Sequence, residues 1–315
     1  MITHPEKVLF PDSGISKGEL CAYYEAIADV MLPHVGGRPV TMERYPAGIG
    51  RKGFIQKDVA KGFPDWLERV EVARRGGKTE GPVHYPLAND ARALTWLANQ
   101  NAITLHVWCS RLPDLERPDL CLFDLDPPEN RPVPLREAVL SVRAVLDELG
   151  LSSFVKTSGS KGFHVALALD ATVSFETSWR FAQGVGRCLV KRHPEVFTQE
   201  FIKADRGGRI LIDTGRNGRG ATFAAPYTVR AKPGAPVSAP CTWQEIESGV
   251  VTPQTFTLRG MAERLGKVGD LWHELPSAKT SLDAAFDALQ GHLTDDDWQE
   301  AVRAATRRPS SRKRS

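Results

Sequence analysis

Apolar residues recur along this chain with two spacings, one typical of helices and one typical of strands. Residues 16–31 begin with Ser-Lys-Gly-Glu, which is a capping box, and then carry apolar side chains at helical intervals. This pattern predicts an amphipathic helix that Pro33 ends. Helical spacing returns in residues 90–101, 134–149 and 178–192, and Gly150 is expected to cap the second of these helices.

Short apolar and β-branched runs separate these helices and predict strands. They cover residues 39–44, 103–108, 120–126, 154–157, 164–169, 208–213 and 221–230. The runs at 154–157 and 164–169 flank a turn that contains glycine, which indicates a hairpin. Helices interleaved with hairpin-like strand pairs favour an α+β fold with largely antiparallel sheets over a doubly wound parallel sheet. After Pro253 the pattern is helical again, and we expect one packing face to hold Leu258, Met261, Leu265, Leu282, Phe286 and Leu289.

The strand predicted at residues 120–126 ends in two carboxylates. Side chains alternate between the faces of a strand, so Asp124 and Asp126 lie side by side while the apolar residues between them face the other way. Pro127 has no backbone N–H to donate to a neighbouring strand, so the strand should end there and leave both carboxylates at the edge of a sheet. Such a pair repels itself unless a cation intervenes, and its oxygen donors suit Mg²⁺ or Mn²⁺. The same pattern also fits a strand that simply enters a turn.

A second apolar strand, predicted at residues 208–213, also ends in an aspartate. Two cations about 3.5–4 Å apart need a ligand beyond the first two aspartates, and it must come from elsewhere in the chain. Asp213 can supply it, although an aspartate at a strand end is also a common turn or cap residue. We therefore take Asp124, Asp126 and Asp213 as the candidate catalytic and metal-binding residues.

Hydroxyl and basic side chains surround the glycine turn at residues 157–164, whose sequence is Thr-Ser-Gly-Ser-Lys-Gly-Phe-His. Exposed backbone N–H groups, the hydroxyls of Ser158 and Ser160 and the Lys161 ammonium would together form a cradle for a triphosphate. The phosphate-loop pattern G-x-x-x-x-G-K-[ST] is absent from the sequence. Taken alone, the segment is equally compatible with an ordinary hairpin turn.

Other basic residues have two interpretations each. His106 would ordinarily be a hydrogen-bonded core residue, and only its place beside the carboxylate strand suggests a phosphate contact. The guanidinium groups of Arg216, Arg219 and Arg230 would bind phosphates or bases, or remain exposed without a specific partner. Residues 203–206, Lys-Ala-Asp-Arg, lack the glycine of the lysine-x-Asp-Gly nucleophile motif of nucleotidyl-transferring ligases, so we set that function aside.

Composition excludes membrane-spanning and disulfide-rich classes. The chain has 315 residues, of which 41% are hydrophobic, enough for one large domain or two closely packed ones. It contains no apolar run of transmembrane length, and its N-terminal residues lack the apolar segment of a signal peptide, so we expect a cytoplasmic protein. The five cysteines are far apart and favour buried, reduced thiols over a disulfide framework or a zinc knuckle.

The formal charge of +3 is unevenly distributed. Six basic residues and no acidic residue lie from Arg303 onward, whereas the rest of the chain holds 35 Lys and Arg against 38 Asp and Glu. We therefore expect one catalytic domain over residues 1–300 and a basic, disordered tail over residues 301–315. The tail would hold phosphate backbones or would serve only as a solubilising terminus.

Several separated segments, taken in order, resemble one protein family. They are His-Pro-x-Lys-Val-Leu-Phe-Pro at residues 4–11, His106-Val107, Phe123 to Pro127, residues 157–164, and Ile212-Asp213 with the run from Ala221 to Arg230. Together they are similar to the polymerase domain of bacterial ligase D, in the archaeo-eukaryotic primase superfamily, over about residues 3–275. The resemblance implies a primase-polymerase core built around antiparallel sheets. It also implies a template-directed nucleotidyltransferase that adds one or a few nucleotides, often ribonucleotides, at gaps or ends in DNA repair.

The resemblance assigns roles to individual residues. The carboxylates that bind two ions of Mn²⁺ or Mg²⁺ are matched by Asp124, Asp126 and Asp213. The contacts with the incoming NTP or dNTP are matched by His106, Ser158, Lys161, His164 and Arg230. The two basic residues of the family that bind the 5′-phosphate at the far side of a gap or break correspond to Lys7 and Lys17. The implied partners are gapped or broken DNA with a 5′-phosphate, a separate DNA ligase and Ku. We expect a monomer that is associated with the nucleoid in the bacterial cytosol.

The chain departs from the family at three points. His4 stands where some relatives have an asparagine in the 5′-phosphate pocket. The aromatic pair of the N-terminal region is Phe54-Ile55 here, which weakens a stacking role for the second position. Neither a ligase nor a phosphoesterase domain accompanies these segments, so we expect a stand-alone form.

Two rival functions fit parts of the sequence. A phosphohydrolase would use one aspartate of the D-x-D pair as a covalent nucleophile, although Pro127-Pro128 follows where that class usually has Thr or Val. A DNA-end or gap-binding adaptor would keep the same residues with vestigial catalysis. Release of phosphate without a template would indicate the first function, and gap binding without extension the second.

Overall fold

Two sheets form the centre of the structure, a computed structural model that describes residues 1–59, 62–74, 81–129 and 133–306. The larger sheet has the strand order β11-β12-β8-β10-β9-β14 and the smaller one the order β13-β7-β3-β4. Among the described strands of both sheets, only β11 and β12 pair in parallel. The predicted α+β fold with largely antiparallel sheets is therefore confirmed.

The strands follow the predicted apolar runs closely. The larger sheet consists of β8 (Leu120–Asp126), β9 (Phe154–Thr157), β10 (Phe163–Ala168), β11 (Phe197–Thr198), β12 (Ile210–Asp213) and β14 (Pro240–Cys241). The smaller sheet consists of β3 (Val40–Arg44), β4 (Phe54–Gln56), β7 (Ala102–Val107) and β13 (Phe223–Ala224). Two hairpins stand apart from both sheets, β1 (Val8–Phe10) with β2 (Ile15–Ser16) and β5 (Arg69–Val72) with β6 (Val83–Pro86).

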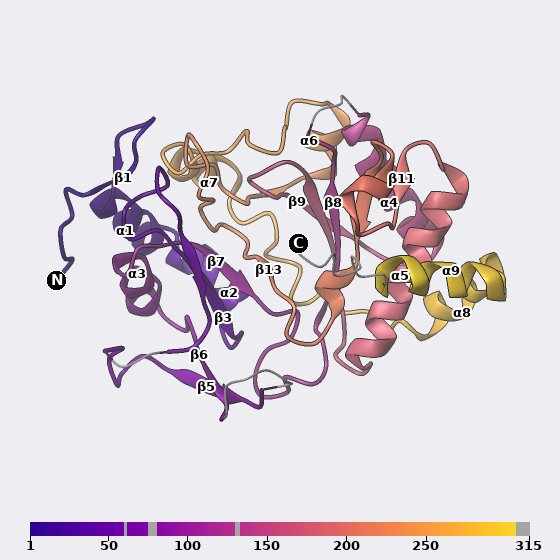
Figure 1. Ribbon diagram of the computed structural model, residues 1–315, viewed down its shortest axis with the longest axis horizontal. Helices are drawn as coiled ribbons and strands as arrows, with labels where there is room; N and C mark the ends of the chain where they lie inside the picture. The colour runs from indigo at the N-terminus through magenta and orange to yellow at the C-terminus, as the bar shows by residue number, and fades with distance from the viewer. Residues whose placement is uncertain (60–61, 75–80, 130–132, 307–315) are drawn as a thin grey trace, which may run out of the picture.

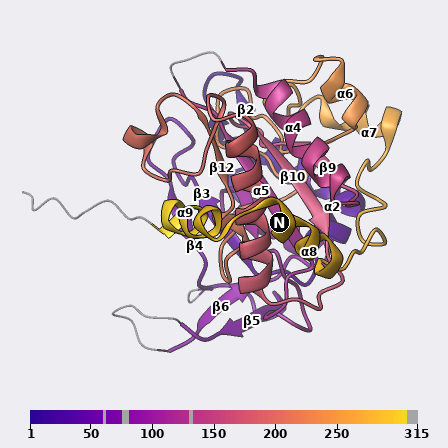
Figure 2. The ribbon, with the colours of Figure 1, turned by 90° about the vertical axis from the view of Figure 1, so that its right-hand side faces the viewer.

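Helices cover the outer sides of the two sheets. On the left of Figure 1, α1 (Lys17–Ala26) packs against α3 (Ala91–Asn99), which contacts β7, and α2 (Ala28–Val35) lies beside them. On the right, α4 (Leu135–Glu148) and α5 (Phe175–Arg192) pack on the larger sheet, and Figure 2 shows α8 (Asp283–His292) and α9 (Asp295–Thr306) outside α5. Shorter elements complete the chain: η1 (Lys203–Arg206), η2 (Gly215–Asn217), α6 (Trp243–Glu247) and α7 (Met261–Val268).

The larger sheet contributes side chains to two hydrophobic cores. Leu120 and Leu122 of β8 join the core around the smaller sheet, whereas Phe123 and Leu125 join the core beneath α4 and α5. Because neighbouring side chains of a strand point to opposite faces, one strand can serve both cores. Asp124 has the same parity as Leu122, so it lies on the face that is turned toward the smaller sheet.

The five cysteines are all buried and none forms a disulfide, as the sequence predicts. None of the helices in the described part of the chain is long and apolar enough to cross a membrane.

Several predicted elements have different limits in the structure. The expected helix over residues 16–31 is two helices, because α1 ends at Ala26 and α2 starts at Ala28. Its predicted capping box is present, since the Ser16 hydroxyl accepts from Glu19 N and the Glu19 carboxylate accepts from Ser16 N. Pro33 does not end the helix but lies inside α2, which continues to Val35. The predicted strand over residues 221–230 shrinks to β13, because Pro226 lacks an N–H and Tyr227 adopts a positive φ of 65°.

The C-terminal prediction also needs correction. Leu258 and Met261 belong to the core around the smaller sheet, whereas Leu282 and Leu289 belong to the other core, so the expected single packing face does not exist. Helix α9 runs through residue 306, so the domain boundary predicted at residue 300 falls inside a helix. The rest of the predicted tail, residues 307–315, lies outside the described residues.

Candidate active site

Three carboxylates meet at one end of the larger sheet. Strand β12 runs antiparallel to β8 in a register that sets Asp213 directly opposite Asp124. Asp126 is two residues further along β8 and shares the face of Asp124. Burial, aided by the neighbouring carboxylates Asp213 and Asp126 and opposed by Arg216, raises the pKa of Asp124 to about 6. The predicted juxtaposition of the D-x-D pair and Asp213 is therefore present.

Two arginines neutralise these carboxylates. Arg216 bridges two of them, with its Nε 3.3 Å from Asp124 Oδ2 and its Nη2 3.3 Å from Asp213 Oδ2. Arg206 Nη1 lies 2.9 Å from Asp126 Oδ2. The sequence singled out Arg216 without naming a partner, and it carries no signal for Arg206, which reaches Asp126 from η1. Each of the three carboxylates thus has an arginine as its counter-charge.

The donor set fits a hard divalent cation by its chemistry. Three carboxylates of adjacent strands supply only oxygen atoms, the donors that Mg²⁺ and Mn²⁺ prefer. Among the described residues, however, no three His, Cys, Asp or Glu side chains are already arranged around one point as metal ligands. A cation at Asp124 and Asp213 therefore requires Arg216 to give up its bridge between them.

The predicted triphosphate loop is the turn between β9 and β10. The Ser158 hydroxyl accepts from the N–H groups of Ser160 and Gly162, at 3.1 Å each, so these two N–H groups already have a partner within the turn. Lys161 lies outside the turn's hydrogen bonds and forms an ion pair with Glu129, which also contacts Lys203 Nζ at 3.1 Å. Within the described part of the chain, the turn thus presents a lysine that pairs with an exposed carboxylate.

The turn tolerates only glycine at one position. A Cβ added to Gly162 would lie 1.7 Å from the backbone oxygen of Leu125, which belongs to β8. Gly162→Ala must therefore push the loop away from the carboxylate strand, and we expect it to lower the free energy of unfolding by about 1–3 kcal/mol. Urea unfolding of the variant measures this loss. Gly266→Ala, in α7 with open space around it, is the matched control and should leave stability nearly unchanged or slightly raised. Equal stability of both variants would show that the loop shifts at no cost.

Two histidines from different sheets and an arginine from the segment after β13 lie near the carboxylates: His164, His106 and Arg230. Strand β10 pairs His164 with Asp124, and the His164 Nε2 is 3.5 Å from Asp124 Oδ1. Burial, with the nearby charges of Lys156 and Arg230, holds the pKa of His164 well below its ordinary value. Arg230 Nη1 donates to the Ser158 carbonyl at 2.5 Å, so it binds the triphosphate loop directly. His106, on β7, instead approaches Glu43, with its Nε2 3.6 Å from Glu43 Oε2.

Two charged residues of this region escaped the sequence analysis. Lys156 is fully buried on β9 opposite His164, and its ammonium donates to the Ser238 hydroxyl. Burial holds the pKa of Lys156 well below its ordinary value. Glu43 lies on β3, and Tyr45 OH donates to its Oε1 at 2.7 Å. Neither Lys156 nor Glu43 belongs to a recognisable motif. Each is a charged residue within a predicted strand, and that alone does not indicate a functional role.

Lys7 and Lys17 lie together but away from the carboxylates. They flank the β1–β2 hairpin, where Lys17 N donates to Lys7 O at 2.8 Å, on the left of Figure 1. The Lys17 side chain is buried, and its Nζ donates to Thr3 Oγ1 at 2.8 Å. Burial and the nearby charges of Lys7 and Arg44 lower the pKa of Lys17. His4 does not join them, because its ring is turned to Glu6 at 3.6 Å.

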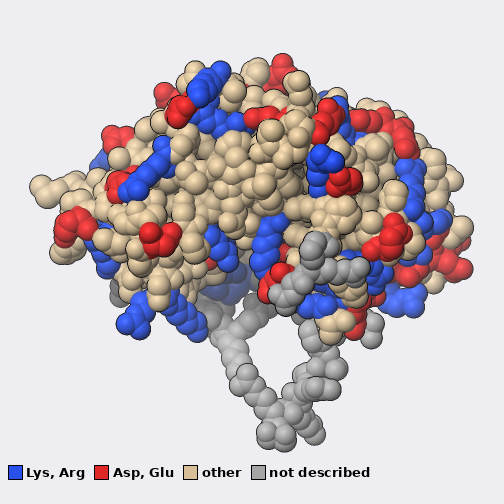
Figure 3. Space-filling view, turned by 90° about the horizontal axis from the view of Figure 1, so that it is seen from above, with Lys and Arg blue, Asp and Glu red and all other residues tan. Residues whose placement is uncertain are grey.

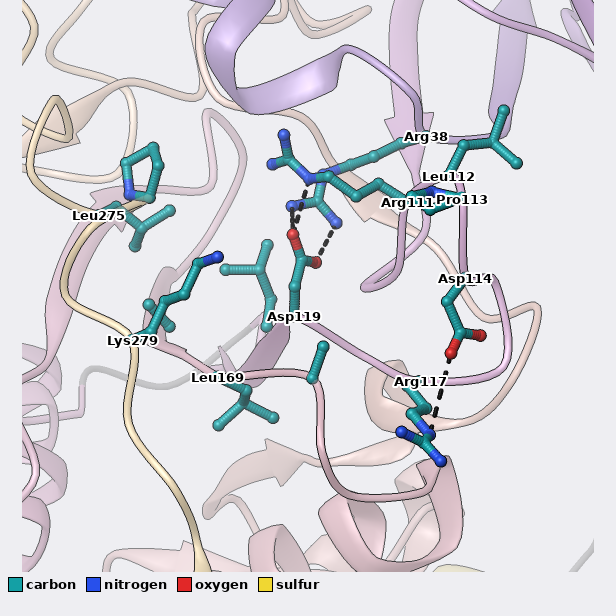
Figure 4. A pocket seen from close by; sticks show the side chains of 14 residues that line it. Arg38, Arg111, Leu112, Pro113, Asp114, Arg117, Asp119, Leu169, Leu275 and Lys279 are labelled. Atoms are coloured by element: carbon teal, nitrogen blue, oxygen red, sulfur yellow. Dashed lines mark hydrogen bonds and ion pairs between the residues drawn. The ribbon is translucent and has the colours of Figure 1, made fainter.

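Figure 4 shows a cavity of about 320 Å³ at the opposite end of β8. Asp119, which directly precedes β8, is held there by Arg38 Nη2 at 2.7 Å and Arg111 Nε at 2.7 Å. Arg38 is fully buried and also donates to the carbonyl oxygens of His34 and Trp108. These bonds anchor the start of the carboxylate strand, and none of the candidate site residues lines this cavity.

Comparisons with known proteins agree on one family. Residues 16–272 match the family described as LigD, primase-polymerase domain. The multifunctional non-homologous end joining protein LigD of Mycolicibacterium smegmatis is 36% identical over 275 residues, which cover 86% of this chain and 35% of that protein. The protein of the same name from Pseudomonas aeruginosa is 34% identical over 290 residues, covering 90% of this chain and 34% of that protein. This chain thus spans about a third of the length of these curated relatives.

A solved structure is similar over nearly its whole length. It is the polymerase domain of Mycobacterium tuberculosis ligase D in complex with DNA, with a TM-score of 0.81 and 33% sequence identity. The match covers 89% of this chain and 99% of that one. The two sheets and the helices around them therefore have the arrangement found in that domain.

Proposed function

The chain belongs to the family of LigD primase-polymerase domains, and from this premise we propose that it is a template-directed nucleotidyltransferase that adds one or a few nucleotides at gaps or ends of DNA. The observation that carries the proposal is the meeting of Asp124, Asp126 and Asp213 at the end of two adjacent strands. Beside them lies the loop that carries Lys161, and Arg230 is bonded to this loop at Ser158, so both cations can receive a triphosphate. We propose repair by non-homologous end joining as its setting, with ribonucleotides as preferred substrates.

Asp124, Asp126 and Asp213 would hold two ions of Mn²⁺ or Mg²⁺ after Arg206 and Arg216 release them. Such ions, when bound, lower the pKa of the primer 3′-hydroxyl and stabilise the charge of the triphosphate. His164 packs against Asp124 and would keep that carboxylate in place. Lys161 and Arg230 would neutralise the charge that develops on the leaving phosphates, and Ser158 orders the loop that carries Lys161.

On the DNA side, Lys7 and Lys17 would grip the 5′-phosphate of the downstream strand. On the face shown in Figure 3, basic side chains are interspersed with acidic ones rather than gathered into one basic surface. On this face, the distribution favours contacts with particular phosphates over a broad electrostatic attraction. We further propose that the protein acts as a monomer in the bacterial cytosol at the nucleoid, with a DNA ligase and Ku as partners.

Extension of a labelled primer on a gapped duplex tests this function. Each NTP and dNTP is supplied in Mg²⁺ and in Mn²⁺, with and without the template base. The proposal expects template-dependent addition with release of pyrophosphate. Release of phosphate without a template would instead identify a phosphohydrolase, and gap binding without any addition an adaptor.

Lys161→Ala should raise the KM for the nucleotide about tenfold, because the variant loses one charge-assisted contact with the triphosphate. Affinity for the gapped duplex should change less than twofold, since the proposed partner of Lys161 is the nucleotide. Single-nucleotide insertion kinetics and a DNA-binding titration measure the two effects.

The matched control is Lys267→Ala, which removes an exposed lysine that pairs with a glutamate in α7, far from the carboxylates. It should change neither quantity. An unchanged KM beside a large loss of DNA affinity in Lys161→Ala would assign this lysine to DNA rather than to the nucleotide.

A further inference from the structure

Glu43 is a charged side chain of this site to which nothing above gives a role. Its side chain is 22% exposed, and it is held by Tyr45 OH at 2.7 Å and faces His106 Nε2 at 3.6 Å. Burial alone would raise its pKa, but the nearby His106, the hydrogen bond from Tyr45 and the charge of Arg230 outweigh burial and lower the pKa of Glu43 to about 2. The side chain is therefore an anion at neutral pH.

The smaller sheet sets three side chains in a row on one face. Glu43 stands directly opposite Thr104 of β7 and Ile55 of β4, and residues directly opposite each other share a face. His106 is two positions beyond Thr104 and lies on the same face. The order across this face is therefore His106, then Glu43, then Ile55, whose side chain is 60% exposed.

The His106 end of this row is the end near the carboxylates and the triphosphate loop. Phe223 of β13 is paired with Val107, the neighbour of His106, and its ring centroid is 6.3 Å from that of His164. Arg230 binds the loop at Ser158 and lies within electrostatic reach of both Asp124 and Glu43. Phosphates at Arg230 and His106 would therefore place the next part of a nucleotide, the sugar, at Glu43 and the base near Ile55.

A carboxylate at the sugar position has one useful partner. It accepts hydrogen bonds and donates none, so it repels phosphate and attracts hydroxyl groups. Glu43 Oε1 already accepts from Tyr45 OH, whereas Oε2 is 3.6 Å from the nearest nitrogen of His106 and has capacity for a donor. A ribose offers a 2′-hydroxyl that a deoxyribose lacks.

We propose that Glu43 accepts a hydrogen bond from the 2′-hydroxyl of the incoming nucleotide and so selects ribonucleotides over deoxyribonucleotides. The inference rests on the proposed polymerase function. It adds the residue that distinguishes the two sugars: a site built to bond a hydroxyl discriminates against the substrate that lacks it.

The test compares single-nucleotide insertion of ATP and dATP opposite thymine in a gapped duplex, as the ratio of their kcat/KM values. The parent protein should favour ATP, and Glu43→Ala should lower the ratio at least tenfold, the usual size of one charge-assisted hydrogen bond. Glu43→Gln, which keeps the shape and loses the charge, should fall between them. Glu263→Gln, the same change at an exposed residue of α7, should have the same ratio of kcat/KM values as the parent protein.

A further arm uses 3′-deoxyATP, which keeps the 2′-hydroxyl and should be inserted by the parent about as well as ATP. Discrimination against 3′-deoxyATP would overturn the assignment to the 2′-hydroxyl. Equal loss of ATP and dATP insertion in Glu43→Ala, or a parent that does not favour ATP, would make Glu43 a structural residue and leave the polymerase function standing. Insertion of no nucleotide by the parent would overturn both proposals.

Discussion

Asp124→Ala should reduce primer extension by at least a thousandfold and should leave the protein folded. The variant loses a carboxylate that would hold a cation, and the transition-state stabilisation lost with such a ligand is about 4 kcal/mol or more. The fold should survive because Asp124 stands near the end of β8, on the polar face of the site. Arg216 loses one of its two ion pairs and keeps the other with Asp213, and His164 loses one contact. Steady-state extension in Mg²⁺ and Mn²⁺, with circular dichroism of both proteins, measures the two expectations.

The matched control is Asp287→Ala, an exposed carboxylate of α8 on the far side of α5. It removes the same group and should keep the activity of the parent. Asp213→Ala should behave like Asp124→Ala, because the register of β12 and β8 makes the two residues partners in one site. Activity of Asp124→Ala within tenfold of the parent would contradict the assignment of a metal to these carboxylates.

A gapped duplex with a 5′-phosphate on its downstream strand should bind more tightly than the same duplex with a 5′-hydroxyl. We expect a difference of about 1–3 kcal/mol, which is roughly 5-fold to 150-fold in Kd, from charge-assisted contacts with Lys7 and Lys17. The backbone bond between the two lysines keeps the residues adjacent, and the charge of Lys7 lies within electrostatic reach of the Lys17 ammonium. The double variant Lys7→Ala/Lys17→Ala should bind both duplexes alike and should still extend a simple primed template.

Fluorescence anisotropy at one fixed, low salt concentration measures the affinities, because phosphate contacts weaken steeply with salt. Lys267→Ala/Lys279→Ala removes the same charge from two exposed lysines elsewhere and should keep the preference for the 5′-phosphate. Equal affinity of the parent for both duplexes would mean that the pocket is absent and that His4, whose ring contacts Glu6, marks a lost site.

The parts of the site that the sequence predicts are those that depend on local rules. Strand alternation places Asp124 and Asp126 on one face, and a hairpin with a glycine turn brings residues 158–161 to the same end of the sheet. The meeting with Asp213 depends on the pairing of β12 with β8, which is not local. Its likeness to the first strand, an apolar run that ends in an aspartate, was enough to suggest it.

Contacts between distant segments were beyond this reasoning. Arg206 reaches Asp126 across 80 positions of the chain and Arg216 reaches Asp124 across 92, and no pattern in their own surroundings indicates these two partners. Glu43 acquires its place only when β3 pairs with β7, since nothing in Met-Glu-Arg separates it from an ordinary surface glutamate. The break between α1 and α2 at Ile27 was missed because the apolar spacing continues through it.

The burial of all five cysteines has a chemical consequence. Burial raises the pKa of Cys21 to about 11 and those of Cys121 and Cys241 to about 12, and it raises the pKa values of Cys109 and Cys188 as well. The thiolate is the form that reacts with peroxides and alkylating agents, and the folded protein keeps almost none of it at neutral pH. The five thiols should therefore react only slowly with the kinds of oxidant that also break DNA strands.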